Sequence, residues 1–228
     1  MNNIINESDI FKINENFHIN HQKIKGTDIS VVVVDNFYAN PEKVRKFSSE
    51  LPYTKSKYIL KNSPGVRVNL KLDINKIKFL IYDLIGLTNS QIKYKKSSYV
   101  IFNRMRSDEK LSLIQTHPHI DSIDKINCAM VVYLNTEDEC SGGTSFYRHK
   151  KSGLDIVKTS EDLSLIKFKY LKHNKDFITD SNDDWELLEL IPMKFNRMVI
   201  YPHNLFHSGY IKRDDFLEYD RVVQLGFF

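Results

Sequence analysis

The sequence contains few cysteines and little glycine or proline. The two cysteines, Cys128 and Cys140, form no C-x-x-C motif, so two free thiols are the expectation. Eight glycines and six prolines are scattered at apparent turns. No internal repeat and no linker divides the chain, so we expect a single domain over residues 1–228.

Long hydrophobic runs are also absent. The longest aliphatic run lies within residues 29–34 and is too short to cross a bilayer. The N-terminal residues are polar and acidic, without the basic start and apolar core of a secretory signal. We therefore expect a cytoplasmic protein that does not associate with membranes.

Neither positively nor negatively charged residues are in large excess. Lys and Arg number 33 against 29 Asp and Glu, a formal charge of +4, and the basic residues are spread along the chain. This gives no support for nucleic-acid binding. With 228 residues and 41% hydrophobic content, the chain can form a sizeable core without a metal to hold it. A metal, if bound, would be functional.

The first 95 residues combine a strand with helices. Ser30–Phe37 is rich in valine and predicts a strand. A helix is expected over residues 41–51, where Pro41 suits the first turn and Asn40 the cap. A second helix is expected over residues 73–87, where apolar residues recur at helical spacing and Asp73 can cap.

From residue 98 onward the apolar runs become short and rich in Val, Ile, Tyr and Phe. Eight such runs are expected strands: SYVIFNRM, LSLIQTHPHI, CAMVVYLN, TSFYRH, ELLELIPMKF, RMVIYP, FHSGYI and RVVQLGFF. Their number and spacing indicate an all-β sandwich or barrel. Residues 150–184 interrupt the series as a Lys-rich insertion with a helical centre near 161–171. It is either a lid or substrate loop, or a solvated excursion.

Four of the eight histidines fall into two clusters, each at the end of an expected strand. The clusters are the segments THPHID (116–121) and YPHNLFH (201–207). Residues two apart in an extended segment point to the same side, so His119 and Asp121 share a side. A histidine on a neighbouring strand, His207, completes a three-ligand face around one metal.

Two neutral imidazoles and a carboxylate bind Fe(II) and leave coordination positions for a cosubstrate and oxygen. His119, Asp121 and His207 are therefore the candidate metal ligands. His117 shares a side with His119, so His117, His119 and His207 are an alternative, histidine-rich site of the cupin type. His203 either lines the mouth of the pocket or is merely hydrogen-bonded.

Motifs follow one another in a characteristic order over about Tyr99 to Phe228. They are His119-Ile-Asp121, VVYLN (131–135), GGTSFY (142–147), Tyr201-Pro with His207, and Arg221 in the closing strand. In this order the sequence resembles the Fe(II)/2-oxoglutarate-dependent dioxygenases, especially the prolyl-hydroxylase-like branch.

The resemblance implies roles for residues around the metal. Arg221 would pair with the distal carboxylate of 2-oxoglutarate, since a buried carboxylate needs a charged and preferably bidentate donor. Tyr133 would donate to the same carboxylate, and Thr144 would add a hydroxyl. Arg213 is an alternative to Arg221, but it lies in an expected turn. Asn196 and Arg197 are expected to shape the turn before RMVIYP.

The expected fold is mainly β with supporting helices, a double-stranded β-helix (jelly-roll) barrel. Residues 1–95 would support a core formed by 96–228. The implied function is an oxygenase that uses Fe(II), 2-oxoglutarate and O2 to hydroxylate an amino-acid or peptidyl side chain, releasing succinate and CO2. Tyr99 and Asn103 are candidate contacts to a small-molecule or peptide substrate. The alternative is a cupin-like metal-binding protein, and the sequence indicates no oligomeric state.

Overall fold

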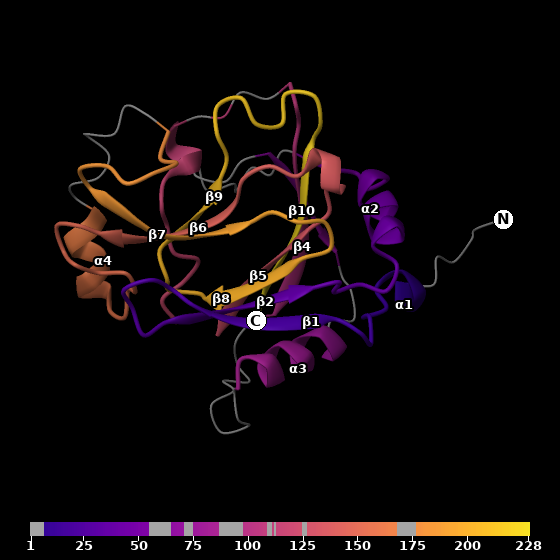
Figure 1. Cartoon of the computed structure of the whole chain (residues 1–228), viewed down its shortest axis with the longest axis horizontal. Coiled ribbons are helices and arrows are strands. Elements are labelled where there is room, and N and C mark those ends of the chain that lie inside the picture. The colour runs from indigo at the N-terminus through magenta and orange to yellow at the C-terminus, as the bar shows by residue number, and fades with distance from the viewer. Residues whose placement is uncertain are drawn as a thin grey trace.

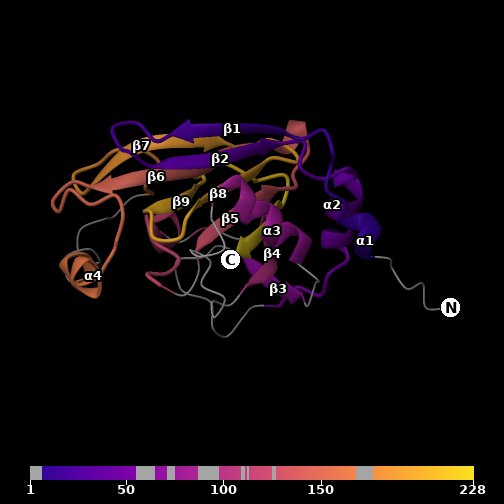
Figure 2. The same cartoon turned by 90° about the horizontal axis from the view of Figure 1, so that it is seen from below.

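The computed structural model describes residues 7–54, 65–70, 75–86, 98–108, 111, 113–124, 127–167 and 177–228. The chain forms two antiparallel sheets, with helices at the periphery (Figures 1 and 2). This is a mainly β fold with supporting helices, the jelly-roll barrel that the sequence predicts. None of the described helices is long and apolar enough to cross a membrane.

The larger sheet has seven strands in the order β1-β2-β8-β5-β10-β4-β3. These strands are β1 (His18–Lys23), β2 (Ser30–Asp35), β3 (Val66–Leu70), β4 (Tyr99–Met105), β5 (Cys128–Tyr133), β8 (Met198–Pro202) and β10 (Arg221–Phe227). The smaller sheet has the order β7-β6-β9. Its strands are β6 (Gly143–His149), β7 (Trp185–Pro192) and β9 (His207–Tyr210).

Successive side chains of the larger sheet point to opposite faces, and each face forms a hydrophobic core of its own. The outer face packs against α1 (Glu7–Ile10), α2 (Pro41–Ser49) and α3 (Asn75–Leu84), with Val44 and Ile81 as buried helix contacts. Figure 1 shows α3 on the side away from β6 and β7. The inner face packs against the smaller sheet through Val131, Val223 and Phe146. The space between the sheets is where inward-facing polar residues meet.

The N-terminal elements agree with the sequence in part. The expected strand and the first helix form as β2 and α2, with Asn40 at the cap position but without a side-chain cap hydrogen bond. The second helix forms as α3, whereas Asp73 lies outside the described residues. Strands β1 and β3 were not expected. β1 is the polar sequence HINHQK at a sheet edge and is mostly exposed, so it lacks the alternation that marks a strand.

Seven of the eight expected strand segments form strands. The exception is LSLIQTHPHI, where the 3-10 helix η1 (Leu113–Thr116) precedes an extended His119. The strand prediction for this segment is wrong because Pro118 has no N–H to donate to a ladder. One hydrogen-bonded bridge, between His119 and His207, replaces the strand.

The insertion carries the helix α4 (Ser160–Lys167), at the end of the molecule away from α1 and α2 (Figures 1 and 2). Part of the insertion is packed against the rest of the chain, although much of its described surface is exposed. Val157, Ile166 and Ile178 are buried with Trp185 and Phe206 in a third core. The insertion is therefore joined to the segment that leads into β9.

Candidate metal centre

The structure brings His119, Asp121 and His207 together, as the sequence predicts. One nitrogen or oxygen ligand atom from each of the three side chains lies within 4.8 Å of the other two. The two histidines exchange backbone hydrogen bonds in both directions, each 2.9 Å from N to O. Their ring centroids are 4.6 Å apart. A pair of residues joined in this way points both side chains to the same side of the sheet.

Asp121 is positioned by the turn between β8 and β9. Its backbone N–H donates to the carbonyl of His203 at 2.9 Å. Its Oδ2 lies 3.5 Å from His207 Nε2. That oxygen is buried and has no hydrogen-bond partner among the described residues. An orphaned buried carboxylate oxygen beside two imidazoles indicates that a cation is needed there.

Backbone carbonyls hold both imidazoles in one tautomer. His119 Nδ1 lies 3.1 Å from the carbonyl of His117, and His207 Nδ1 lies 2.9 Å from that of Leu205. A carbonyl can only accept, so each Nδ1 carries the proton and donates. The lone pair of each Nε2 is then free for a metal.

Burial favours the uncharged form of all three side chains. It lowers the pKa of His119 to about 4 and that of His207 to about 4. It raises the pKa of Asp121 to about 6, against the opposing charges of His119 and Arg67. Neutral imidazoles are competent ligands, and a divalent cation would compensate the buried carboxylate. Two nitrogens, one oxygen and free coordination positions fit Fe(II).

The remaining histidines of the two clusters do not join the three ligands. His117 is outside the group whose ligand atoms converge, so the histidine-only alternative lacks its third ligand. Both ring nitrogens of His203 are occupied by carbonyls, those of Asn127 at 2.7 Å and Ile123 at 2.9 Å. Of the two alternatives for His203, the structure therefore supports a hydrogen-bonded residue rather than one that lines the mouth of the pocket.

A second group of polar side chains lies between the two sheets, on β5 and β6. Tyr133 Oη and Thr144 Oγ1 are 2.6 Å apart and both side chains are buried. Burial raises the pKa of Tyr133 to about 12, opposed by the hydrogen bond to Thr144 and the charge of Arg221. The sequence predicted these three residues as one binding group, and the structure places them close together.

Arg221 is 5% exposed, and no carboxylate of the described residues pairs with it. Its Nε is buried without a hydrogen-bond partner there. Burial lowers its pKa, while Tyr133 and Tyr201 oppose that shift. An unpaired guanidinium inside a barrel is costly unless an anion binds to it.

Arg213, the alternative to Arg221, lies outside the barrel interior, and so do the turn residues Asn196 and Arg197. Arg213 is exposed and stacks over the ring of Phe177, with 4.9 Å between Cζ and the ring centroid. Asn196 has a φ of 60° at the expected turn. Arg197 pairs with Asp35 through two hydrogen bonds, of 2.6 and 2.9 Å. Arg221 is therefore the one of the two candidates that faces the barrel interior.

Sequence reasoning left the role of Asn135 unassigned. Its amide nitrogen donates to the carbonyl of Asp220 at 2.8 Å, and its Oδ1 accepts from the backbone N–H of Val222 at 2.8 Å. The side chain is fully buried. These two bonds flank Arg221 and fix where its backbone begins β10. The VVYLN motif thus supplies both the Tyr133 phenol and the clamp for Arg221.

Tyr201 connects the two polar groups. Its ring centroid is 4.6 Å from that of His207, and burial raises its pKa well above the usual value. The charge of Asp121 also raises this pKa, and the charge of Arg221 opposes the shift. The ring is therefore in contact with one of the metal ligands and within electrostatic reach of the buried guanidinium.

The substrate contacts named from the sequence, Tyr99 and Asn103, also face inward on β4. Tyr99 is 41% exposed and stacks on Phe227 with centroids 4.9 Å apart. Asn103 is 2% exposed and pairs in register with Arg67 of β3. Arg67 was missed because β3 was not expected, and its charge acts on both His119 and Asp121.

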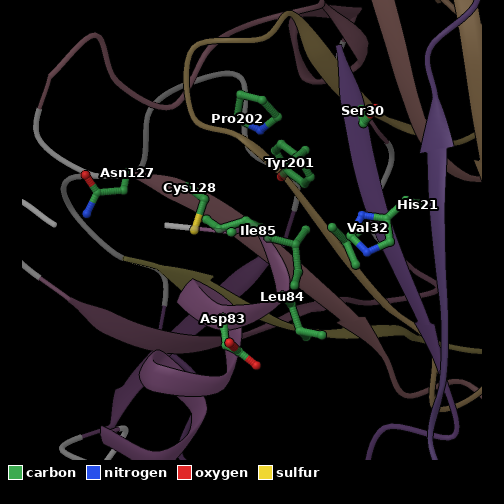
Figure 3. A pocket seen from close by; sticks show the side chains of 12 residues that line it. His21, Ser30, Val32, Asp83, Leu84, Ile85, Asn127, Cys128, Tyr201 and Pro202 are labelled. Carbon is green, nitrogen blue, oxygen red and sulfur yellow. The ribbon is translucent and has the colours of Figure 1, made fainter. Parts of the chain in front are cut away.

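A cavity of about 610 Å³ lies elsewhere, between α3 and the neighbouring strands. Figure 3 shows Asp83 and Leu84 on one side and His21 and Val32 on the other. None of the three metal-ligand candidates lines it. It is separate from the metal centre.

The chain belongs to a family described as "Family of unknown function (DUF6445)", which it matches over residues 15–223. No curated protein matches it significantly. The family description assigns no chemistry, so the roles of the residues are argued from their geometry.

Several solved structures have a backbone similar to that of this protein. A prolyl-4-hydroxylase from Pseudomonas putida is 10% identical over 83% of this chain and 83% of that chain, with a TM-score of 0.45. SnoK, an alpha-ketoglutarate-dependent carbocyclase from nogalamycin biosynthesis, is 9% identical over 86% and 78%, with a TM-score of 0.48. HygX from Streptomyces hygroscopicus, solved with nickel and 2-oxoglutarate, is 10% identical over 87% and 82%, with a TM-score of 0.46.

Proposed function

We propose that this protein is an Fe(II)- and 2-oxoglutarate-dependent oxygenase that hydroxylates an amino-acid or peptidyl side chain. The proposal rests on two buried charged side chains that lack partners among the described residues. Asp121 has an orphaned carboxylate oxygen among the ligand atoms, and Arg221 has an unpaired buried guanidinium. Iron would compensate the first charge, and the distal carboxylate of 2-oxoglutarate the second.

The residues would divide the work of binding. His119, Asp121 and His207 would hold one face of Fe(II), with the imidazole rings fixed by the carbonyls of His117 and Leu205.

The cosubstrate would be held at its far end. Arg221 would bind the distal carboxylate through its planar fork, and Tyr133 and Thr144 would add hydroxyl donors. Tyr201 would line the path between the metal and this carboxylate. Such a clamp fixes the cosubstrate before oxygen enters and excludes water from the site.

Bound iron supplies oxygen activation, for which 2-oxoglutarate is the two-electron reductant. The overall reaction balances because 2-oxoglutarate, O2 and a C–H bond yield succinate, CO2 and a C–OH group. One oxygen atom enters succinate and the other enters the substrate. The proposal includes release of both small products, and the substrate is a small molecule or a peptide.

The cupin-like alternative does not account for the same observations. A histidine-only site would need His117 beside His119 and His207, but the converging third ligand is Asp121. It would also leave the buried charge of Arg221 without an anion. The alternative is therefore not favoured.

The test is to add Fe(II) and 2-oxoglutarate to the metal-free protein without oxygen and to record the visible charge-transfer absorption of the chelate. We expect a band that His207→Ala abolishes and that His18→Ala, a change on the exposed strand β1, leaves intact. Iron binding without a band would contradict the assignment of the cosubstrate site. Asp121→Ala should lose turnover, and unchanged turnover in that variant would contradict the ligand set.

A further inference from the structure

We propose that Arg67 binds a carboxylate of the substrate beside the metal centre, so that the substrate is a carboxylic acid. This inference rests on the proposed oxygenase function and narrows its substrate class. It favours a free amino acid or another small acid over an uncharged side chain within a peptide.

The register of the larger sheet places Arg67 on the inner face. Arg67 pairs with Asn103 of β4, Asn103 with Val223 of β10, and Val223 with Tyr133 of β5. Partners in register point to the same face. Val223 and Tyr133 belong to the core between the two sheets. Arg67 therefore faces the space that holds the metal ligands, at the edge strand of the sheet.

The guanidinium of Arg67 lacks a partner in this position. Its Nε is buried without a hydrogen-bond partner among the described residues. Burial lowers its pKa, while Tyr99 and Asp121 oppose that shift. Asp121 is not its partner, because neither Asp121 Oδ2 nor Arg67 Nε has a hydrogen bond among the described residues, and that oxygen is assigned to the metal in the proposed site. The charge of Arg67 thus calls for an anion that the described residues do not provide.

The far end of the cosubstrate does not supply that anion. Its distal carboxylate is assigned to Arg221, which is on β10, whereas β3 lies two strands away across β4. Adjacent strands are about 4.8 Å apart, so the two backbones are separated by about 10 Å. Arg67 is instead within electrostatic reach of His119 and Asp121. It lies on the metal side of the site, where the reacting substrate must be.

The surroundings of Arg67 fit a small acid. Tyr99, at 41% exposure, shares the charge environment of Arg67 and forms a ring platform with Phe227. A planar guanidinium matches a carboxylate through two parallel hydrogen bonds. Asn103, its neighbour in register, adds a polar side chain to the same row.

The test uses the protein loaded with Fe(II) and saturating 2-oxoglutarate, without oxygen. Acetate and N-acetyl-L-proline are the carboxylate probes, N-acetyl-L-prolinamide is the uncharged match, and inorganic phosphate is the alternative anion. Binding is read from the shift of the charge-transfer band. We expect carboxylates to shift the band, with at least tenfold weaker binding in Arg67→Met and an intermediate loss in Arg67→Lys. The amide should have no effect.

Arg106→Met is the matched control, because it removes the same charge from an exposed residue that pairs with Asp108. It should bind the probes as the unchanged protein does. Thermal unfolding verifies that each variant is folded, and Arg67→Lys preserves the charge if Arg67→Met is unstable.

The outcomes separate the two proposals. No band in the unchanged protein would overturn both. A normal band with no Arg67-dependent response to carboxylates would overturn only the role of Arg67, as would a stronger Arg67-dependent response to phosphate. Loss of the band itself in Arg67→Met would assign Arg67 to the cosubstrate and overturn the inference as well.

Discussion

Arg221 combines a stability cost with a binding function in one side chain. Its guanidinium is 5% exposed, and its Nε has no partner among the described residues. Removing a charge from water without a counter-ion costs several kcal/mol in principle, part of which relaxation recovers. A residue kept under these conditions is expected to recover that energy from a ligand. The same reasoning applies to the orphaned oxygen of Asp121.

Replacing Arg221 by methionine should separate the cost from the function. We expect Arg221→Met to stabilise the metal-free protein by about 1–3 kcal/mol, because an unpaired buried charge is replaced by an apolar chain of similar length. We expect 2-oxoglutarate to bind about 30- to 150-fold more weakly, the loss of a charged hydrogen bond worth about 2–3 kcal/mol. Urea unfolding and titration of the charge-transfer band measure the two effects.

A loss of both stability and cosubstrate binding would contradict this account, since it would mean that Arg221 has a structural partner. Arg213→Met changes an exposed arginine and serves as the comparison. It should alter neither quantity.

The hydroxyls of Tyr133 and Thr144 should act as one unit. They are 2.6 Å apart, so removing either one breaks the same hydrogen bond. We expect Tyr133→Phe and Thr144→Val each to weaken 2-oxoglutarate binding about fivefold, equivalent to about 1 kcal/mol. The double variant should lose little more than either single one. Strictly additive losses would show that the two hydroxyls act independently.

Sequence reasoning reached the residues whose roles depend on local spacing. His119 and Asp121 share a side because they are two apart in an extended segment, and that required no tertiary knowledge. Arg67 was missed because VRVNL is too short and too polar to predict a strand by itself. Asn135 was quoted within a motif, but its bonds to Asp220 and Val222 depend on the pairing of distant strands.

Among the elements, the insertion before β7 contributes to the site through its packing. Phe206 donates its backbone N–H to the carbonyl of Asp155, and Val157 donates to that of Asn204. Ile178 donates its backbone N–H to Thr116 Oγ1 at 3.0 Å. The insertion thus contacts both segments that carry metal ligands, the one before His119 and the one before His207. Sequence alone left open whether the insertion was solvated.

Truncating the insertion core should destabilise the protein strongly. Ile178 is 1% exposed, and we expect Ile178→Ala to lower the free energy of unfolding by about 2–4 kcal/mol through lost burial and a residual cavity. Leu165→Ala, at 62% exposure on α4, is the matched control and should cost less than about 0.5 kcal/mol. Urea denaturation of both variants measures the difference. Equal, small losses would show that the third core contributes little.

The pairing of β2 with β8 should make stability depend on pH. Asp35, at the end of β2, accepts from Arg197 at 2.6 and 2.9 Å and from Lys194 at 3.2 Å. The hydrogen bond from Arg197 lowers the pKa of Asp35 below 3.8. A carboxyl with a lowered pKa stabilises the fold above pH about 4, and this contribution is lost as pH falls through the folded-state value.

Asp35→Asn should therefore lower the free energy of unfolding by about 1 kcal/mol at pH 7, discounted because the pair is partly exposed. The difference from the unchanged protein should shrink as pH falls below about 4, because the carboxyl of the unfolded chain is protonated before that of the folded chain. Urea unfolding across pH 3–7 measures it. A difference that stays constant with pH would show that Asp35 acts through packing rather than charge.

Across the whole molecule, the site forms where the two sheets face each other. Arg221 and Tyr133 come from the larger sheet, Thr144 and His207 from the smaller one. The short β-branched runs predicted this jelly-roll class, since they alternate with turns and are rich in Val, Ile and Tyr. They could not predict the strand order, because pairing depends on contacts between segments far apart in sequence. β10 pairs with both β4 and β5, and only that arrangement puts Arg221 near Tyr133.

Because the sheets contribute ligands jointly, binding should stabilise the entire fold. A ligand that binds only the folded state adds RT ln(1 + [L]/Kd), about 2.7 kcal/mol at 100 times Kd. For a chain of 228 residues, each kcal/mol corresponds to about 2–4 °C in the unfolding temperature. We expect Fe(II) with 2-oxoglutarate, both in excess and without oxygen, to raise Tm by about 5–10 °C.

The two components should contribute in a fixed order, because 2-oxoglutarate would bind partly through the iron. Without iron, 2-oxoglutarate should raise Tm little, and Arg221→Met should reduce the additional rise that it causes over Fe(II) alone. His207→Ala should abolish both steps, while His18→Ala on the exposed edge strand should keep them. An equal rise in His207→Ala would mean that the metal binds elsewhere on the surface. A rise with 2-oxoglutarate alone would mean that Arg221 and the two hydroxyls bind it without the metal, which would contradict the order of assembly proposed for this site.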